Sequence, residues 1–485
     1  MQPLLKQHTH SSNPVNSAIE LTSHVINFND KVLAVDIFSY LSHLPWAIWL
    51  DSCDNSHVDS QFDILVWDPA VTLSTKNKIT KIENVANNSI MTSAKDPLFL
   101  VNQAIEETFS NINVSASIKF PFKGGAVGYF AYDLGREFEI LPELCEQDIH
   151  IPEMSVGIYN KAIIFDNKTQ NFHLLCLENE RSDIETTLFS LFKTANQNKK
   201  LEFTLDSDWL SNMTQTEYAQ KFTQVHEYLL AGDCYQINLA QRFSANYSGD
   251  EFQAYKTLRE ENNAPFSAFI RLEDAAILSI SPERFLQLND QQVQSKPIKG
   301  TRPRHHLAEL DQQAAEELKT SAKDKAENLM IVDLLRNDIS KVCEAGSVVV
   351  PKLFDIESFP AVHHLVSTVE GKLSAQFNAT DLLRGAFPGG SITGAPKIRA
   401  MEIIEELEPH RRSIYCGSIG YISACGNMDT SITIRTLICE SNKIHCWAGG
   451  GLVADSVLAD EYQETFDKVN KIIPVLKGKF LHSKT

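Results

Sequence analysis

Three runs in the second half of the chain decide the predicted fold: CYQINLAQRF (residues 234–243), FSAFIRL (266–272) and AILSISPERFLQL (276–288). Each run has the length and the apolar and aromatic content of a strand. Helical spacing precedes them after Thr214, which forms a predicted capping box with Glu217, and recurs at 323–338, 400–407 and 460–476. Strands and helices mix without regular alternation, so the sequence predicts an α+β fold.

The chain also suggests its own division. TANQNKKLEFTLDSD (194–208) is a polar segment typical of a boundary. We therefore expect a polar N-terminal segment over 1–30, a first region over 31–200 and a catalytic region over 214–473. A further hairpin is predicted from DTSITIRTLIC (429–439) and KIHCWAGGG (443–451).

Composition excludes several classes of protein. A net charge of −18 argues against an extended nucleic-acid surface, and it requires that any anionic substrate be attracted by a local group of cations. The N-terminus lacks the pattern of a signal peptide, and no run approaches the ~18 apolar residues of a membrane span. Nine scattered cysteines without a CxxC pair indicate reduced thiols, so we expect a cytoplasmic protein with no membrane contact.

Lys299 is placed unusually in QSKPIKGTRPR (294–304). It follows Ile298, precedes Gly300 and lies two residues after Pro297. From these residues alone it is either a solvated surface charge or an amine held where it can react.

Three carboxylates are ambiguous in the same way. Glu327 shares a predicted helix face with apolar residues, which buried carboxylates do only when paired or metal-bound, although a place near the helix N-terminus is an equal explanation. Glu464 lies off the apolar face predicted for its helix, which favours a solvated charge. Glu283 ends a strand, where solvated loop charges are common. The apolar face predicted around Glu464 comprises Tyr462, Phe466 and Val469.

Two glycine-rich stretches and one arginine are the remaining candidates for functional residues. AGGGLVAD (448–455) and PGGSITGAPK (388–397) are predicted loops that either turn backbone N–H groups toward an anion or only make tight turns. Arg435 lies mid-strand in the predicted hairpin and needs an anionic partner if it is buried. An amine, an arginine, two such loops and several carboxylates are what a small dicarboxylate with a divalent cation would require.

In this combination the chain resembles the chorismate-utilising enzyme family, most closely its aminodeoxychorismate synthase component I group. PIKGT, SAKDKAENLMIVDLLRND, FPAVHHLVST, FPGGSITGAPKIRAMEIIEELEP, CGSIGYIS, NMDTSITIRTL and AGGGLVADS…YQETFDKVN occur in the family's order. The motifs cover about residues 214–473 densely, and the first half is less similar. The resemblance implies two large antiparallel sheets flanked by helices, with the catalytic cleft between the sheets.

The resemblance also implies a substrate, chorismate, and a cofactor, Mg²⁺. Glu327 and Glu464 match the family's magnesium ligands, and Glu283 matches its general acid. Gln236 stands where relatives that add water carry a lysine base. Further positions match the part of the site that holds the substrate: Arg435, Gly449, Gly450, Gly451, His364, Ser391, Thr393 and Lys397.

Lys299 takes a role from the same resemblance. Anthranilate synthases have alanine at this point of the motif, whereas aminodeoxychorismate synthases have the lysine, which attacks the ring, expels the hydroxyl and is then displaced by ammonia. None of the nine cysteines has the Gly-x-Cys-x-Gly context of a glutaminase nucleophile. The resemblance therefore implies a separate glutamine amidotransferase subunit as partner, in a path toward 4-aminobenzoate and folate.

The family's first region also holds a tryptophan. The matching positions are Ser52, Asp59, Ser60, Gln61, Phe62, Pro265, Phe266 and Ser267. Gln61 replaces an expected basic residue, so bound L-tryptophan and an emptied pocket stay open as alternatives. Three other functions compete with the main one: an anthranilate synthase component, a pyridoxal-phosphate enzyme with Lys299 as the Schiff base, and a tryptophan-sensing module.

Overall fold

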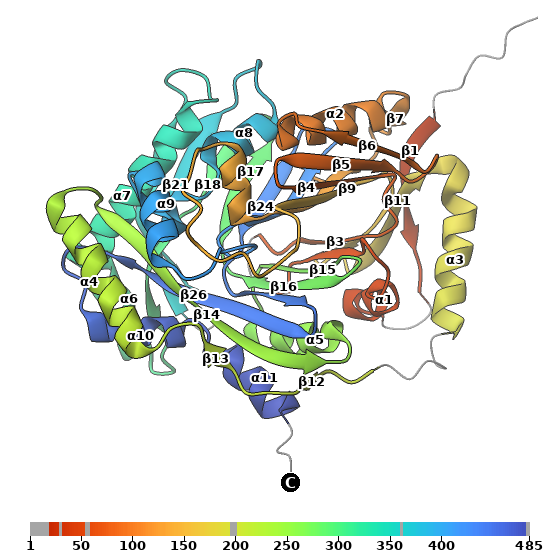
Figure 1. Cartoon of the computed structure of the whole chain (residues 1–485). Helices are drawn as coiled ribbons and strands as arrows, with labels where there is room; N and C mark the ends of the chain where they lie inside the picture. The colour runs from red at the N-terminus through yellow and green to blue at the C-terminus, as the bar shows by residue number, and fades with distance from the viewer. Residues whose placement is uncertain (1–18, 29–31, 54–58, 195–200, 359–361, 482–485) are drawn as a thin grey trace, which may run out of the picture.

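The computed structural model describes residues 19–28, 32–53, 59–194, 201–358 and 362–481, and it confirms the predicted α+β fold (Figure 1). Two large sheets form the centre of the molecule. Among the strand pairs that the structure describes, the pairing is antiparallel except between β1 and β7. No helix in the described ranges is long and apolar enough to cross a membrane.

The first sheet has fourteen strands. In spatial order its path is β12 (Thr204–Leu205), β14 (Gln236–Ser248), β26 (Lys443–Leu452), β25 (Thr436–Glu440), β16 (Ala275–Ser281), β15 (Phe266–Arg271), β2 (Ile48–Asp51), β3 (Phe62–Val66), β10 (Ala162–Asp166), β11 (Asn171–Leu177), β1 (Ile19–Ile26) and β7 (Ile112–Val114). Two short strands, β13 (Leu210–Ser211) and β22 (Gly394–Ala395), also pair with β14.

The second sheet has twelve strands. Its order is β19 (Ile298–Pro303), β21 (Val362–Lys372), β18 (Gln292–Ser295), β17 (Arg284–Asn289), β24 (Met428–Ile432), β23 (Ser418–Ser423), β8 (Gly125–Phe130), β9 (Met154–Tyr159), β4 (Val71–Lys76), β5 (Ile79–Asn84) and β6 (Ser89–Ser93). The strand β20 (Val349–Ser358) pairs with β21 outside this path.

Helices flank the sheets, as expected. Near the sheet ends that carry β14, β26, β19 and β21 lie α4 (Gln215–Ala231), α6 (Ala308–Thr320), α7 (Ala322–Ser340), α9 (Lys397–Leu407) and α10 (Leu458–Asp467) (Figure 1). The others are α1 (Ala34–Leu41), α2 (Pro97–Phe109), α3 (Arg181–Thr194), α5 (Glu251–Asn262), α8 (Ala379–Ala386) and α11 (Ile473–Phe480).

Local signals in the sequence explain where these helices begin and end. The capping box before α4 is confirmed: the Glu217 N–H donates to Thr214 Oγ1 over 3.2 Å, and the Thr214 N–H donates to Glu217 Oε2 over 2.7 Å. The predicted C-terminal helix over 460–476 is instead two helices, α10 and α11. Pro474 lies in the first turn of α11, where its missing N–H costs nothing.

Each sheet takes strands from both halves of the chain. In the first, β15 pairs with β2, placing Phe269 opposite Trp49. In the second, β23 pairs with β8, placing Gly420 opposite Gly128. Part of the segment expected to be a polar N-terminus also joins a sheet, because β1 pairs with β11.

The chain crosses between the sheets at two places that lie side by side. One crossing joins β16 to β17 and contains Glu283, and the other joins β24 to β25 and contains Arg435. Backbone hydrogen bonds tie them together: the Ile432 N–H donates to the Glu283 carbonyl, and the Ile280 N–H donates to the Arg435 carbonyl, each over 3.0 Å. The prediction of Arg435 in the middle of a strand is therefore wrong, since it has a φ of 52° at a break between strands.

Candidate active site

Lys299 lies on β19 beside a bulge in its pairing with β21. Lys299 is opposite Leu365 and Thr301 is opposite His364, so Gly300 has no partner of its own in the ladder. Gly300 has a φ of 76°, and a Cβ atom there would lie 2.7 Å from Leu318 Cδ1. The backbone thus needs glycine at this point, and the bulge sets the direction in which Lys299 projects.

The amine of Lys299 is enclosed. Its Nζ donates to the backbone carbonyl of Ser391 over 3.4 Å, a long hydrogen bond. Burial lowers the pKa of Lys299 below its usual range, and the charge of Lys468 acts in the same direction, against the carboxylates of Glu327, Glu283 and Glu464. A neutral, nucleophilic amine is favoured here chiefly because the site is desolvated.

The neighbouring arginines of the motif do not supply this effect. Arg302 forms ion pairs with Glu317 and Asp324, and Arg304 forms one with Asp311. The cation that lowers the pKa of Lys299 is Lys468, from a different part of the chain.

Glu283 also contacts Ser391. The Ser391 hydroxyl donates to Glu283 Oε1 over 3.4 Å, and Glu283 is buried. Burial raises the pKa of Glu283 to about 7, against the opposing charge of Lys299. A carboxyl group with this pKa can donate a proton near neutral pH.

Arg435 and His364 form a polar end of the same site. Burial lowers the pKa of Arg435, with Glu283 acting in the opposite sense. Burial and the adjacent Arg435 charge lower the pKa of His364 to about 4, so the imidazole is neutral at pH 7. Thr301 Oγ1 lies 2.9 Å from His364 Nδ1. Arg435 thus faces the site as a cation beside neutral donors and acceptors.

The three glycines of AGGG lie on β26 and not in a loop, which corrects the prediction. They pair with Asn238, Leu239 and Ala240 of β14, while the ladder with β25 ends at Cys446. Crowding explains the glycines. A Cβ atom on Gly451 would lie 2.7 Å from Gln236 Nε2 and 3.5 Å from Lys299 Nζ, and one on Gly450 would lie 2.9 Å from Glu461 Oε2.

Glu327 and Glu464 approach the site from α7 and α10. The Glu327 side chain is 17% exposed, and burial raises its pKa. The Glu464 side chain is 46% exposed and forms a 2.6 Å ion pair with Lys468, whose charge holds the pKa of Glu464 low against the effect of burial. The predicted apolar face is confirmed only in part: Val469 is buried, but Phe466 is 37% exposed, and Glu461 and Thr465 are buried instead.

These carboxylates fit Mg²⁺ in kind. In the described ranges no group of three or more His, Cys, Asp or Glu side chains is already arranged around a common point. Magnesium, however, retains waters and needs only one or two protein carboxylates. Glu461 Oε2 and Glu464 Oε1 lie 2.9 Å and 3.6 Å from the point that a Cβ atom on Gly450 would occupy, so two oxygens converge there.

Sequence reasoning missed Glu461 and Lys468. Glu461 is buried on α10 and accepts a 2.7 Å hydrogen bond from Ser456 Oγ. Lys468 Nζ donates to the Gly449 carbonyl over 2.7 Å. Glu461 and Glu464 are three residues apart and share a helix face, a signal that the spacing in EYQE could have given.

The other matched positions divide into two groups. Gln236 is fully buried, and neither its Nε2 nor its Oε1 has a hydrogen-bond partner among the described residues, so its amide is available to a ligand. Thr393 Oγ1 donates to the Gly389 carbonyl over 3.0 Å. Lys397 Nζ donates to Asp338 Oδ2 over 2.6 Å and to the Ala386 carbonyl. The described contacts of Thr393 and Lys397 are thus structural and are not directed at Lys299.

A second site lies between the same two sheets. We call it the Ser52 cavity: a space of about 80 Å³ whose lining includes six of the eight positions expected to contact tryptophan, Ser52, Asp59, Phe62, Pro265, Phe266 and Ser267. Ser60 and Gln61 do not belong to this lining. Gln61 instead accepts a 3.0 Å hydrogen bond from Lys168 Nζ at the surface.

Comparison with known proteins identifies the family and several relatives of this chain. The family model described as "chorismate binding enzyme" matches residues 47–474. Aminodeoxychorismate synthase component 1 of Escherichia coli (strain K12) is 55% identical over 443 residues, which are 91% of this chain and 95% of that protein. Anthranilate synthase component 1 of Aquifex aeolicus (strain VF5) is 32% identical over 447 residues, 89% of each chain.

A solved structure is similar over most of its length. The crystal structure of anthranilate synthase component I from Streptococcus pneumoniae TIGR4 superposes with a TM-score of 0.74 at 32% identity, covering 85% of this chain and 92% of that one.

Proposed function

This chain belongs to the chorismate binding enzyme family, and on that premise we propose that it converts chorismate and ammonia to 4-amino-4-deoxychorismate. The observation that carries the proposal is Lys299. Its amine is desolvated, its pKa is lowered, and it contacts Ser391, which also contacts Glu283, a carboxyl group with a pKa of about 7. This pairing is what a nucleophile and a proton donor require.

The proposed reaction has two displacements. The neutral Lys299 amine forms a C–N bond to the ring carbon beside the carboxylate-bearing carbon, the ring double bonds shift, and the distant hydroxyl leaves as water with a proton from Glu283. Ammonia then attacks the carbon that lost the hydroxyl, the double bonds shift back, and the bond to Lys299 breaks. The Glu283 carboxylate recovers a proton from nitrogen, so the site returns to its starting state.

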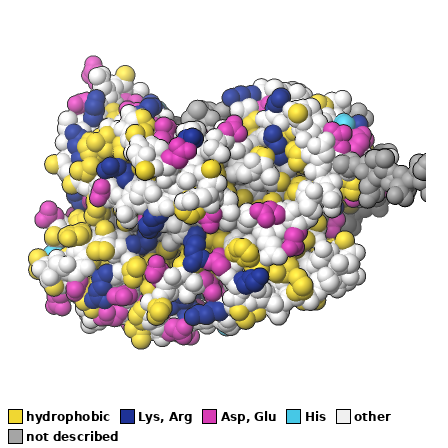
Figure 2. Space-filling model, turned by 90° about the horizontal axis from the view of Figure 1, so that it is seen from above, with side chains coloured by type: hydrophobic (Ala, Val, Ile, Leu, Met, Phe, Trp, Pro, Cys, Tyr) yellow, Lys and Arg dark blue, Asp and Glu magenta, His cyan; other side chains and the backbone are white. Residues whose placement is uncertain are grey.

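Electrostatics in the site support binding of a dianionic substrate. The chain carries a net charge of −18, and on the face seen in Figure 2 acidic and basic side chains are interspersed. Arg435 and Lys468 therefore act as the local cations that hold the substrate carboxylates. The unpartnered amide of Gln236 offers a donor and an acceptor to the incoming ammonia or the ring.

Glu327 and Glu464 would hold Mg²⁺, and Glu461 would add a further carboxylate near Glu464. When bound, the ion would polarise the carboxylate-bearing end of the ring. Glu327→Gln and Glu464→Gln should each raise the magnesium concentration needed for half-maximal activity at least about tenfold, since each removes a charged ligand. Near-parent activity of both variants at limiting magnesium would remove these residues from the metal site.

Ammonia is proposed to come from a separate glutamine amidotransferase subunit. The name of the Escherichia coli relative, component 1, is consistent with such a partner. Free ammonium should then support turnover by the isolated chain, and glutamine should support it only when the partner is present.

The Ser52 cavity is proposed to accept L-tryptophan. Six matching side chains around one space support this, whereas its volume of about 80 Å³ means that side chains must move to admit an indole.

One experiment tests the central proposal. The chain is mixed with magnesium and chorismate without any ammonia source, and its intact mass is measured. We expect a gain equal to chorismate minus water, followed by loss of that gain when ammonium is added. Anthranilate fluorescence in the complete reaction, without an added lyase, would instead identify an anthranilate synthase, and absence of any adduct under trapping conditions would overturn the covalent route.

A further inference from the structure

Arg412 is buried behind the site and has no role in the chemistry described so far. Its side chain is 1% exposed, and it forms an ion pair with Glu408 through Nε, over 2.9 Å, and Nη2, over 2.6 Å. The guanidinium lies 5.0 Å from the ring centroid of Tyr132 and 5.7 Å from that of Tyr415. A charge pair this deep is costly to desolvate, so its other contacts show what it contributes.

Those contacts go to backbone atoms beside the site. Arg412 Nη2 donates to the Asn238 carbonyl over 2.6 Å, and Nη1 donates to the Ile392 carbonyl over 2.9 Å. Glu408 Oε1 accepts a 2.9 Å hydrogen bond from the Ala240 N–H. The ion pair thus binds one acceptor and one donor of β14, two residues apart on one edge of the strand.

This edge is where β14 separates from the segment that carries Ser391. Gln236 is opposite Ala395 and Ile237 is opposite Gly394 in the ladder, and the Asn238 N–H still donates to the Thr393 carbonyl over 2.9 Å. After this last direct hydrogen bond, the backbone of β14 and the backbone of the segment that carries Ser391 are joined through Arg412 and Glu408. The side-chain pair continues the ladder after the direct pairing has ended.

The two backbones joined in this way carry site residues. Ile392 follows Ser391, whose carbonyl accepts from Lys299 and whose hydroxyl donates to Glu283. Asn238 lies two residues after Gln236, whose unpartnered amide approaches Gly451 near Lys299. A shift of either backbone would therefore change the placement of the groups on both sides of the Lys299 amine.

We propose that the Arg412–Glu408 pair is a positioning element that holds Ser391 and Gln236 in register around Lys299. Arg412 touches no reacting atom, so it acts only through the two backbones that it joins. The kinetic part of the inference rests on the proposed function, whereas the geometric part concerns Lys299 itself and holds for any substrate.

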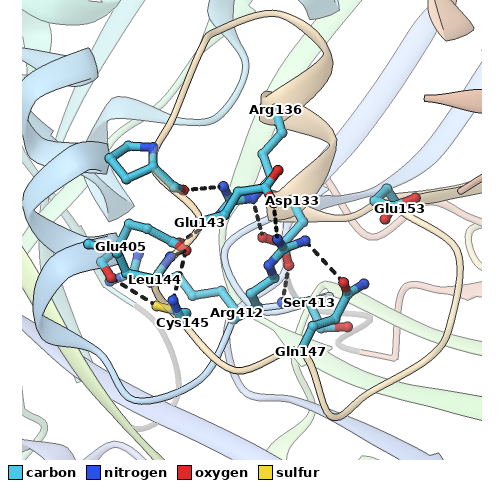
Figure 3. A network of polar contacts seen from close by, with 12 residues as sticks. Asp133, Arg136, Glu143, Leu144, Cys145, Gln147, Glu153, Glu405, Arg412 and Ser413 are labelled. Carbon is cyan, nitrogen blue, oxygen red and sulfur yellow. Dashed lines mark hydrogen bonds and ion pairs between the residues drawn. The ribbon is translucent and has the colours of Figure 1, made fainter. Parts of the chain in front are cut away.

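The chain offers a matched control in Figure 3. Arg136 and Glu405 form a second buried pair, with side chains 12% and 5% exposed, and Glu405 lies on α9, three residues before Glu408. Glu405 Oε1 accepts from the N–H groups of Leu144 and Cys145, each over 2.9 Å, and Arg136 Nη1 donates to the Pro142 carbonyl. This pair binds the loop over 142–145 and, through Asp133, the backbone of Ser413, but its described hydrogen bonds reach neither β14 nor the segment that carries Ser391.

The experiment compares two Arg412 variants with two controls. Arg412→Lys keeps the charge but not the planar set of donors. The double variant Arg412→Met/Glu408→Leu removes both charges, which is better tolerated than removing one. The controls are Arg136→Lys and Arg136→Met/Glu405→Leu. For each we measure kcat and KM, the melting temperature, and the pH midpoint for acetylation of Lys299 by acetic anhydride, read by peptide mass spectrometry without chorismate.

We expect both Arg412 variants to lower kcat by about 10- to 100-fold, the effect of a displacement of about 1 Å, with KM changed less than about threefold. Water admitted to the loosened site should raise the acetylation midpoint of Lys299 by about one pH unit. The controls should lose melting temperature while keeping the parent kcat and midpoint.

Parent values of kcat and midpoint in a folded Arg412 variant would overturn the inference, even if the melting temperature falls. If the double variant does not fold, the kcat and the acetylation midpoint of Arg412→Lys alone test the inference. If the parent chain itself does not turn over chorismate, the proposed function fails, but the acetylation midpoints still decide whether Arg412 positions the site.

Discussion

The Lys299 site and the Ser52 cavity lie between the same two sheets, yet they treat buried charge in opposite ways. Around the cavity, the cations are matched: Arg259 lies 2.5 Å from Asp51, and Arg284 lies 2.9 Å from both Asp429 and Asp59. Around Lys299, a buried amide has no partner among the described residues and the amine has one long hydrogen bond. A buried amide without a partner and a weakly bonded amine indicate a site built for a reactant, whereas cations paired with carboxylates indicate a framework that a ligand can at most occupy.

Among the variants that test this contrast, Lys299→Ala should have the largest effect. We expect no covalent adduct with chorismate, because the nucleophile is absent, while chorismate still binds within about tenfold, a difference of ~1.4 kcal/mol. Intact-mass spectrometry and a binding titration measure the two effects. Lys296→Ala is the matched control. Lys296 lies three residues before Lys299 in the same motif, and it forms an ion pair with Glu357. An adduct of unchanged mass in Lys299→Ala would place the nucleophile elsewhere.

Glu283→Gln should slow adduct formation by about 100- to 10,000-fold, the effect of losing a positioned proton donor. The pH dependence of kcat/KM provides a second test of Glu283. Because burial raises the pKa of Glu283 to about 7, the donor form disappears as the pH rises through 7, and kcat/KM of the parent should fall on that side. The alkaline limb near pH 7 should be absent in the variant, which has no titrating group there. Formation of adduct at the parent rate would assign the acid to another residue.

Arg259→Met tests the paired charges around the Ser52 cavity. It leaves Asp51, a fully buried carboxylate, without its cation, so we expect a loss of about 3–5 kcal/mol in the free energy of unfolding at pH 8 with turnover unchanged. Burial raises the pKa of Asp51 to about 6 even beside Arg259. A proton held more tightly in the folded state stabilises it as the pH falls, so the loss should be smaller at pH 5. Denaturant unfolding at both pH values measures it, and a fall in turnover without a loss of stability would contradict the contrast.

Binding of L-tryptophan in the Ser52 cavity should give the smallest of these effects, a shift in melting temperature. Binding at 100 times its Kd contributes ~2.7 kcal/mol, which for a chain of this size raises the melting temperature by about 3 °C. Thermal unfolding with and without the amino acid measures the shift, and Ser267→Leu, which fills the cavity, should abolish it while leaving chorismate turnover intact. No shift at saturating tryptophan would identify the space as an emptied pocket.

The sequence predicted elements with strong local signals. The helix predicted over 323–338 is α7, and the first two strands quoted are β14 and β15. The third run, 276–288, is not one strand, because it divides at Glu283 into β16 and β17, which lie in different sheets. Their periodicity and length do not depend on distant contacts. The α+β class followed from the order of these elements, which is also a local property.

What the sequence did not predict depends on contacts between distant segments. Arg435 stands in a run that reads as one strand, but the chain crosses there from one sheet to the other with a positive φ. Gly449, Gly450 and Gly451 read as a loop because strands rarely contain glycine in series, whereas here side chains from α10 and β14 leave no room for a Cβ atom. The depressed pKa of Lys299 likewise comes from its burial between segments far apart in the chain, which no local pattern encodes.

The interleaving of the two halves in both sheets has a consequence for synthesis. Ala126 pairs with Ile422, so a ribosome has nearly finished the chain before β8 can meet β23. Long-range antiparallel pairing of this kind forms slowly and leaves strand edges open in the meantime. A nascent chain of this protein therefore carries an unpaired β8 edge through most of its translation, and holding factors that cover such edges would act on it before its active site exists.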